Sequence, residues 1–132
     1  MSATTTYSVG EVSARTGFSI DTLRYYERLG LIAPVERTVG GQRRYRDEDV
    51  GWLDFVSCLR DTGMPVDRMR EFAELCRDGE HTVAERADLL SAHGRQVEAE
   101  IDTLRQKLAA IQHKLDYYRG VLALRENEER QA

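Results

Sequence analysis

The sequence has few of the features that mark disulfide-rich, secreted or membrane proteins. Its 132 residues include two cysteines, Cys58 and Cys76, which are too few for a disulfide scaffold and have no CxxC spacing. It has no secretory signal, no transit peptide and no apolar run long enough to span a bilayer. We therefore expect one domain, or a small domain with an appendage, in the cytoplasm, with reduced thiols and no membrane partner.

The residue patterns of enzymes and metal proteins are also missing. The chain has no paired nucleophile and base, no glycine loop that would cradle a phosphate, and no metal-ligand spacing. The three histidines, His81, His93 and His113, are spread along one expected solvated helix rather than clustered. We expect a protein that is not an enzyme and needs no metal or cofactor.

The charges are divided unevenly along the chain. Between Arg15 and Arg46, seven arginines stand against three acidic residues, a net charge of +4, although the whole chain carries −4. From Asp47 to the end, twelve Lys or Arg stand against nineteen Asp or Glu, a net charge of −7. A basic block followed by an acidic remainder indicates that only the first part meets a polyanion.

The basic block contains a short amphipathic helix over residues 19–31. Ser19 is a suitable N-cap, and Gly30 suits the left-handed position after the helix. Ile20, Leu23 and Leu31 give an apolar stripe. The opposite surface carries hydrogen-bond donors, on Thr22, Arg24, Tyr25 and Arg28. Such a helix is suited to lie on a phosphate backbone and read a groove, although an ordinary surface helix has a similar pattern.

Its neighbours make this helix the second half of a helix-turn-helix. Ser8 and Glu11 form a capping box for a first helix, which breaks at Thr16 and Gly17, so the motif spans residues 8–28. Residues 35–46 then read as a hairpin, with glycines at the tip and cations on the second strand. A cationic hairpin beside a helix-turn-helix is a wing.

Two further helices and a long third one are expected after the wing. Asp47 is the expected cap of the helix 47–62, whose core face carries Val50, Leu53, Val56 and Leu59. The next helix, 65–77, buries Met69, Phe72, Ala73 and Cys76. Residues 1–6 are expected to be a disordered tail, 79–81 a linker and 125–132 a polar tail, so the DNA-binding domain would span 7–78.

The long helix, 82–124, begins with a second capping box at Thr82 and Glu85 and has an apolar heptad pattern. Its narrow stripe needs a partner, most simply a second copy. The residues expected to carry dimerisation are Leu90, Val97, Ile101, Leu104, Leu108, Ile111, Leu115 and Tyr118. Gly94 is a weak point in this stripe. The fold class is thus mainly α, with a winged helix-turn-helix followed by a coiled-coil dimerisation helix.

Several segments together resemble the MerR family of bacterial transcription regulators. They are Tyr7-Ser-Val-Gly-Glu-Val12, Thr22-Leu-Arg-Tyr-Tyr-Glu-Arg-Leu-Gly-Leu-Ile32, Pro34, Gly41-Gln-Arg-Arg-Tyr45 and Asp49-Val50. The resemblance implies a homodimer joined by an antiparallel coiled coil, bound to double-stranded promoter DNA. It also implies distortion of the promoter so that RNA polymerase can use it.

The resemblance also implies which residues contact DNA. Thr22, Arg24 and Tyr25 match the recognition helix of the family, and Arg43 and Tyr45 match its wing, whereas Gln42 replaces a frequent aromatic residue. The full expected set is Ser19, Thr22, Arg24, Tyr25, Arg28, Arg37, Gly41, Arg43, Arg44 and Tyr45. We expect Arg43→Ala to weaken binding to all sequences and to flatten the salt dependence by about one counterion.

The sequence is compatible with more than one interpretation of the signal that this protein answers. The segment Cys58-Leu-Arg-Asp-Thr-Gly-Met-Pro65 resembles the branch of the family that answers aldehydes and nitrosative stress through one thiol. Arg60 and the start of the next helix could favour a thiolate, whereas the dipole of its own helix opposes one. The alternatives are a buried structural Cys58, with a repressor or architectural dimer that needs no ligand, or a coiled-coil adaptor. Cys76 is expected in the core, with a secondary role as a resolving thiol.

Overall fold

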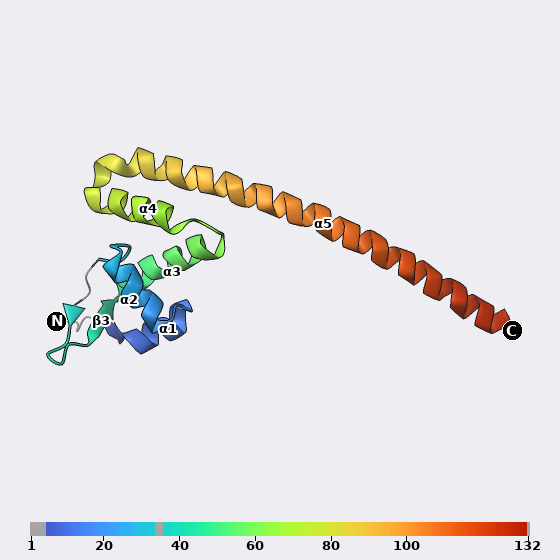
Figure 1. The fold of residues 1–132 in the computed structure, drawn as a ribbon, viewed down its shortest axis with the longest axis horizontal. Helices are drawn as coiled ribbons and strands as arrows, with labels where there is room; N and C mark the ends of the chain where they lie inside the picture. The colour runs from blue at the N-terminus through green and yellow to red at the C-terminus, as the bar shows by residue number, and fades with distance from the viewer. Residues whose placement is uncertain (1–4, 34–35, 132) are drawn as a thin grey trace. The chain divides into compact units, whose positions relative to one another are not determined.

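The computed structural model describes residues 5–33 and 36–131. The elements in chain order are β1 (Thr6–Ser8), α1 (Val9–Thr16), α2 (Ile20–Arg28), β2 (Glu36–Arg37), β3 (Arg43–Arg46), α3 (Asp47–Asp61), α4 (Val66–Asp78), a 3₁₀ turn η1 (Glu80–Thr82) and α5 (Val83–Gln131). They can be followed by colour in Figure 1. The chain forms two compact units that meet between Leu90 and Ser91, and each is described by itself.

The helix-turn-helix is built from the caps that the sequence predicts. The Glu11 amide donates to Ser8 Oγ at 3.2 Å, and the Ser8 amide donates to Glu11 Oε1 at 3.1 Å, which confirms the capping box. Gly17 ends α1 with φ of 80°. Ser19 Oγ then accepts the Thr22 amide at 3.1 Å and starts α2. Gly30, with φ of 79°, has the left-handed conformation expected after this helix.

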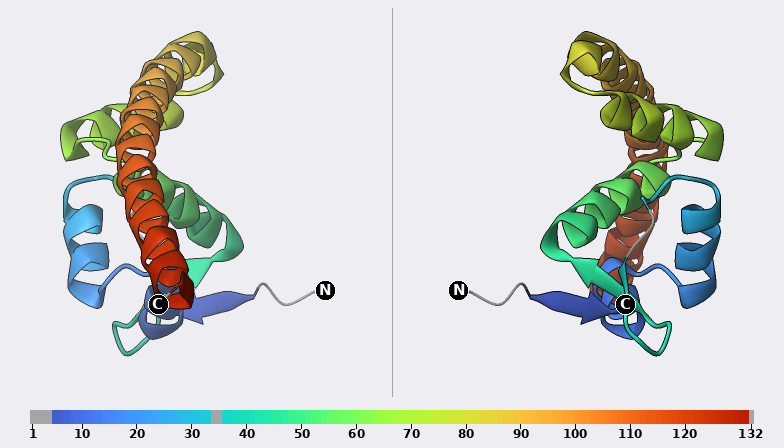
Figure 2. Two further views of the ribbon diagram at one scale, coloured as in Figure 1. Left: turned by 90° about the vertical axis from the view of Figure 1, so that its right-hand side faces the viewer. Right: turned by 90° about the vertical axis from the view of Figure 1, so that its left-hand side faces the viewer.

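The wing belongs to a three-stranded antiparallel sheet of order β1-β3-β2. Strand β1 pairs Tyr7 with Tyr45 and Thr6 with Arg46, and in both views of Figure 2 it runs directly into α1. The expected disordered tail is therefore wrong at Thr6, because β3 supplies a pairing partner from forty residues along the chain. Residues 1–4 of that tail, and Val35 at the start of the expected wing, lie outside the described residues.

One hydrophobic core joins α1, α2, the sheet, α3 and α4. The α3 face of Val50, Leu53, Val56 and Leu59 is buried as predicted, and so are Met69, Phe72 and Ala73 on α4. On α2, Leu23 is buried but Ile20 is 37% exposed, and Tyr26 takes the expected place of Ile20 in the core. The rings of Trp52 and Phe72 stack at 5.7 Å, which holds α3 against α4.

Two helix starts differ from the sequence prediction. Asp47 is the first residue of α3 rather than its cap; the cap is Arg46, whose amide donates to the Asp49 carboxylate at 2.9 Å. The Asp47 carboxylate instead accepts the Tyr7 hydroxyl at 2.7 Å.

At α5, the buried Thr82 hydroxyl lies 2.6 Å from the Leu75 carbonyl and 2.8 Å from that of Gly79. The Thr82 hydroxyl therefore links the start of α5 to the end of α4. Residues 79–81, the expected linker, belong largely to the turn η1.

Helix α5 runs without interruption from Val83 to Gln131, so the expected polar tail is helical as far as Gln131. Among the described residues, no helix is long and apolar enough to cross a membrane. Within α5, Leu90 is half-buried and packs against the core, and Val97 is half-buried. The expected dimerisation residues from Ile101 onward line an exposed stripe: Ile101 is 43% exposed, Leu104 65%, Ile111 66% and Tyr118 55%. No residue of α5 is buried, so this apolar stripe has no cover within the described chain.

Candidate nucleic-acid interface

Helix α2 presents a polar, cationic face to solvent. Arg24, Tyr25 and Arg28 are exposed, with Tyr25 at 46%. Thr22 is half-buried, and its hydroxyl accepts from Ser19 Oγ at 2.8 Å, so these two predicted contact residues also build the N-cap. Because Leu23 and Tyr26 anchor the opposite face in the core, the exposed side chains project from a fixed helix.

Successive side chains of strand β3 lie on opposite sides of the sheet, so their exposure alternates. Arg44 and Arg46 are exposed, whereas Arg43 is half-buried and Tyr45 is only 1% exposed. The expected DNA contact of the Tyr45 side chain is therefore wrong: it is a core residue, since its position on β3 faces the helices. Arg44, on the outer side of the same strand, is exposed and can meet a phosphate.

Arg43 also departs from its expected role. Its guanidinium forms an ion pair with Glu27, near the end of α2, and Arg37 on β2 lies 3.8 Å from the other oxygen of the same carboxylate. Arg37 remains 47% exposed, whereas the side chain of Arg43 is 16% exposed. The structure thus places Arg43 against α2 rather than pointing toward solvent.

The wing tip is a tight turn. The Thr38 amide donates to the Gln42 carbonyl at 2.7 Å, and Gly41 adopts φ of 82°. The Arg37 guanidinium donates to the Gly41 carbonyl at 3.2 Å, which ties the tip to β2. Gly41 is accordingly needed for its backbone conformation, and Gln42 stays exposed beside it.

The start of α1, the face of α2 and the wing surround a basic hollow of about 370 Å³. Its lining includes Arg24, Gly41, Arg43 and Arg44 from the predicted set, with Gln42 from the wing tip, Ser8 from β1 and Val9 from α1. Arg24 and Arg44, exposed cations beside one concave surface, are suited to a polyanion backbone, whereas the guanidinium of Arg43 is paired with Glu27. Ser8 and Val9 were not expected in the site; the pairing of Ser8 on β1 with Arg44 on β3 brings this part of the chain there.

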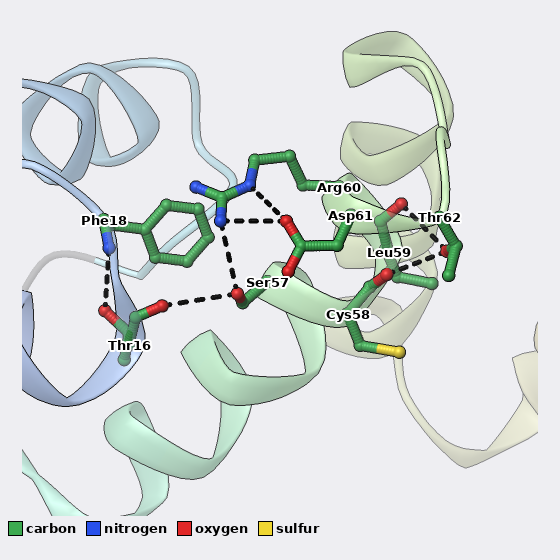
Figure 3. A network of polar contacts seen from close by, with 8 residues as sticks. All are labelled: Thr16, Phe18, Ser57, Cys58, Leu59, Arg60, Asp61 and Thr62. Atoms are coloured by element: carbon green, nitrogen blue, oxygen red, sulfur yellow. Dashed lines mark hydrogen bonds and ion pairs between the residues drawn. The ribbon is translucent and has the colours of Figure 1, made fainter.

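Cys58 lies in the last turn of α3 and is exposed, so the alternative of a buried structural Cys58 is wrong. Figure 3 shows its sulfur pointing away from the polar network around it. Within that network, the Arg60 guanidinium donates to Asp61 at 3.0 Å and lies over the Phe18 ring. Arg60 is thus engaged by Asp61, Ser57 and the Phe18 ring. Cys76 is half-buried and packs against the core.

The three histidines, His81, His93 and His113, belong to no group of three possible metal ligands among the described residues. Across residues 5–33 and 36–131, no three His, Cys, Asp or Glu side chains gather in a way that could hold a metal ion. His81 makes a contact of 3.5 Å with Asp78, one turn away on the surface.

Comparisons with known proteins agree with this architecture. Residues 7–75 match the family described as MerR HTH family regulatory protein, and residues 50–114 match the one described as MerR, DNA binding. An HTH-type transcriptional regulator of Haemophilus influenzae is 34% identical over 90% of this chain and 88% of its own. The regulator AdhR of Bacillus subtilis is 38% identical over 64% of this chain and 60% of its own.

Solved structures show the same fold at similar identity. HiNmlR, a MerR family regulator lacking the sensor domain, bound to promoter DNA, matches with a TM-score of 0.80 and 34% identity over 91% of this chain and 95% of that one. A MerR family regulator from Listeria monocytogenes gives a TM-score of 0.85 and 34% identity over 95% of each chain. With its winged helix-turn-helix, basic hollow and long C-terminal helix, this chain belongs to the MerR family and is a DNA-binding transcriptional regulator, not an enzyme.

Proposed function

We propose that two copies of this chain pair through α5, bind promoter DNA with both α2 helices and both wings, and regulate transcription by RNA polymerase according to the state of Cys58. The proposal that Cys58 senses the signal rests on the exposure of its thiol on α3. This helix supports the DNA-binding core from behind, through Val50, Leu53 and Val56.

The apolar stripe of α5 supports pairing. Residues seven apart, such as Leu104 and Ile111, are more than 60% exposed in one chain. Exposed leucines in heptad positions on a helix of this length are typical of a coiled coil. The antiparallel arrangement comes from the family resemblance, and the partner of the stripe is a second copy of the chain.

The thiol at Cys58 can react with a carbonyl or another electrophile. A thiolate adds to an aldehyde carbon, the carbonyl oxygen takes up a proton, and a hemithioacetal forms without an external oxidant. An adduct in the last turn of α3 adds volume next to Thr62 and Leu59, whose contacts fix the turn into α4. We propose that this displaces α3, rotates the DNA-binding halves and changes the twist of the promoter.

A second candidate is a regulator that needs no signal at Cys58. The observation in its favour is that Arg60 is engaged by Asp61 and Phe18, and that the C-terminal dipole of α3 opposes a thiolate. The same exposed thiol would then be an incidental surface residue.

The test is run-off transcription and footprinting with wild type, Cys58→Ser and Cys76→Ser proteins, each with and without formaldehyde or methylglyoxal. The DNA is a duplex that the wild-type protein selects from a random pool, placed in a promoter. We expect the output to change with the electrophile in wild type and Cys76→Ser but not in Cys58→Ser. A response retained by Cys58→Ser, or no response in wild type, contradicts sensing at this thiol and leaves the second candidate.

A further inference from the structure

The residue that joins the recognition helix to the wing is Glu27. One oxygen of its carboxylate pairs with Arg43, and the other lies 3.8 Å from Arg37. The side chain of Glu27 is 14% exposed and that of Arg43 is 16% exposed, so this pair is largely shielded from solvent. A carboxylate within a basic DNA-binding surface opposes the charge that DNA requires, and its placement there calls for a reason.

The register of the wing strands explains why a carboxylate lies there. Arg37 on β2 and Arg43 on β3 are direct cross-strand partners. Like charges directly opposite each other destabilise a strand pair, and a hairpin whose β2 has two residues has little stability of its own. Glu27 places one negative charge against both cations, and thereby fixes both strands to α2 at the last residue pair before the wing tip.

We propose that Glu27 is a positioning residue for DNA binding. By holding the wing against α2, it sets the separation between Arg24 on the helix and Arg44 on the wing, the exposed cations on either side of the basic hollow. Both arginines then meet the DNA backbone at a fixed spacing, and the ordering of the wing does not have to occur on binding.

A positioning role and a simple charge effect predict opposite changes in DNA affinity when Glu27 is removed. If Glu27 acted only as a charge, its removal would strengthen DNA binding at all sequences and steepen the salt dependence. If it holds the wing, its removal weakens binding, because Arg44 no longer stays at the required spacing. The wing carries a second carboxylate, Glu36, which is exposed and is the cross-strand partner of Arg44.

The experiment compares full-length Glu27→Gln, Glu36→Gln and wild-type proteins by DNA affinity, salt dependence and hydroxyl-radical footprinting on the selected duplex. We expect Glu27→Gln to bind about tenfold more weakly, and Glu36→Gln to bind as tightly as wild type or more tightly. Arg44→Gln identifies the backbone positions protected by the wing, and Arg24→Gln those protected by α2. Glu27→Gln should lose the first set and keep the second.

The double variant Glu27→Gln/Arg43→Gln separates positioning from a folding defect. It leaves no unpaired buried charge, and we expect it to remain folded by circular dichroism and to lose the same wing protections as Glu27→Gln. Unchanged or tighter binding by Glu27→Gln with a complete footprint overturns the proposal. So does a double variant that is folded and restores the wing protections, since the pair would then be unnecessary.

Discussion

The guanidinium of Arg60 lies 4.3 Å from the centroid of the Phe18 ring. Arg60 is in the last turn of α3, and Phe18 is a buried residue of the turn between α1 and α2. The same turn is held by Ser57, whose hydroxyl donates to the Thr16 carbonyl at 3.3 Å. The end of α3 therefore contacts the backbone that leads directly into the N-cap of the recognition helix, as Figure 3 shows.

Replacing Arg60 should loosen this turn. We expect Arg60→Met, which keeps most of the apolar stem, to lower the free energy of unfolding by about 1 kcal/mol through loss of the cation–π contact. Arg68→Met removes an exposed cation that pairs with Glu71 on its own helix, and we expect a change below about 0.5 kcal/mol. Urea unfolding measures both. Equal effects of the two changes would contradict a role for the Phe18 contact.

Variants of Tyr45 and Arg44, neighbours on β3, should distinguish a side chain that packs in the core from one that contacts DNA. Because Tyr45 is buried and Arg44 is exposed, we expect Tyr45→Phe to keep the DNA affinity within about twofold. Arg44→Ala should weaken binding and reduce the salt slope by about one counterion. Tyr45→Ala should lower the unfolding free energy by about 3 kcal/mol. A large loss of affinity in a stable Tyr45→Phe protein would restore the hydroxyl as a contact.

The pairing of α5 can be tested with two leucines of equal exposure. Leu104 is 65% exposed and lies in the heptad stripe, whereas Leu124 is 64% exposed and lies outside it. We expect Leu104→Glu to raise the dimer dissociation constant by more than about tenfold, since it puts a charge into an apolar interface. Leu124→Glu should leave it near the wild-type value in sedimentation equilibrium. The same change for both variants would mean that the stripe is not the interface.

The capping box of α1 gives a pH dependence with a defined sign. Hydrogen bonds from the backbone and then the side chain of Ser8 lower the pKa of the Glu11 carboxyl below its usual 4.5. The stabilisation is therefore present above the unfolded pKa and is lost as the pH falls through the folded pKa. We expect wild type to exceed Glu11→Gln in urea midpoint at neutral pH, and the gap to narrow below about pH 4. A gap that is constant over this range would contradict the box as its source.

Local signals in the sequence accounted for much of the fold. Ser8, Ser19, Gly17 and Gly30 act within a few residues of themselves, because capping and left-handed turns are local properties of the backbone. The helical periodicity of α3 and α4 likewise identified their buried faces. The long helix was predicted too, although its helical end extends to Gln131, since a polar composition does not by itself end a helix.

Within the candidate site, the sequence did not distinguish the exposed side chains from those that pack inward. The sequence identified Arg24, Arg28 and Arg44 as candidate DNA contacts, and their side chains are exposed. It could not show that Arg43 and Tyr45 face inward, because strand alternation leaves the buried side undefined until the sheet packs on something. The family pattern of the wing assigned both to DNA.

By itself, the sequence determined the helix-turn-helix, the wing, the α5 stripe and the family, since each depends on spacing along the chain. Only the tertiary structure decided which residues far apart in the chain meet. It paired Thr6 with Arg46, Tyr7 with Asp47, Arg60 with Phe18, and Glu27 with Arg43. It also showed the Cys58 thiol exposed at the end of α3. The physical reason is that a cap is satisfied within one turn of helix, whereas an ion pair or a buried ring depends on how whole elements pack.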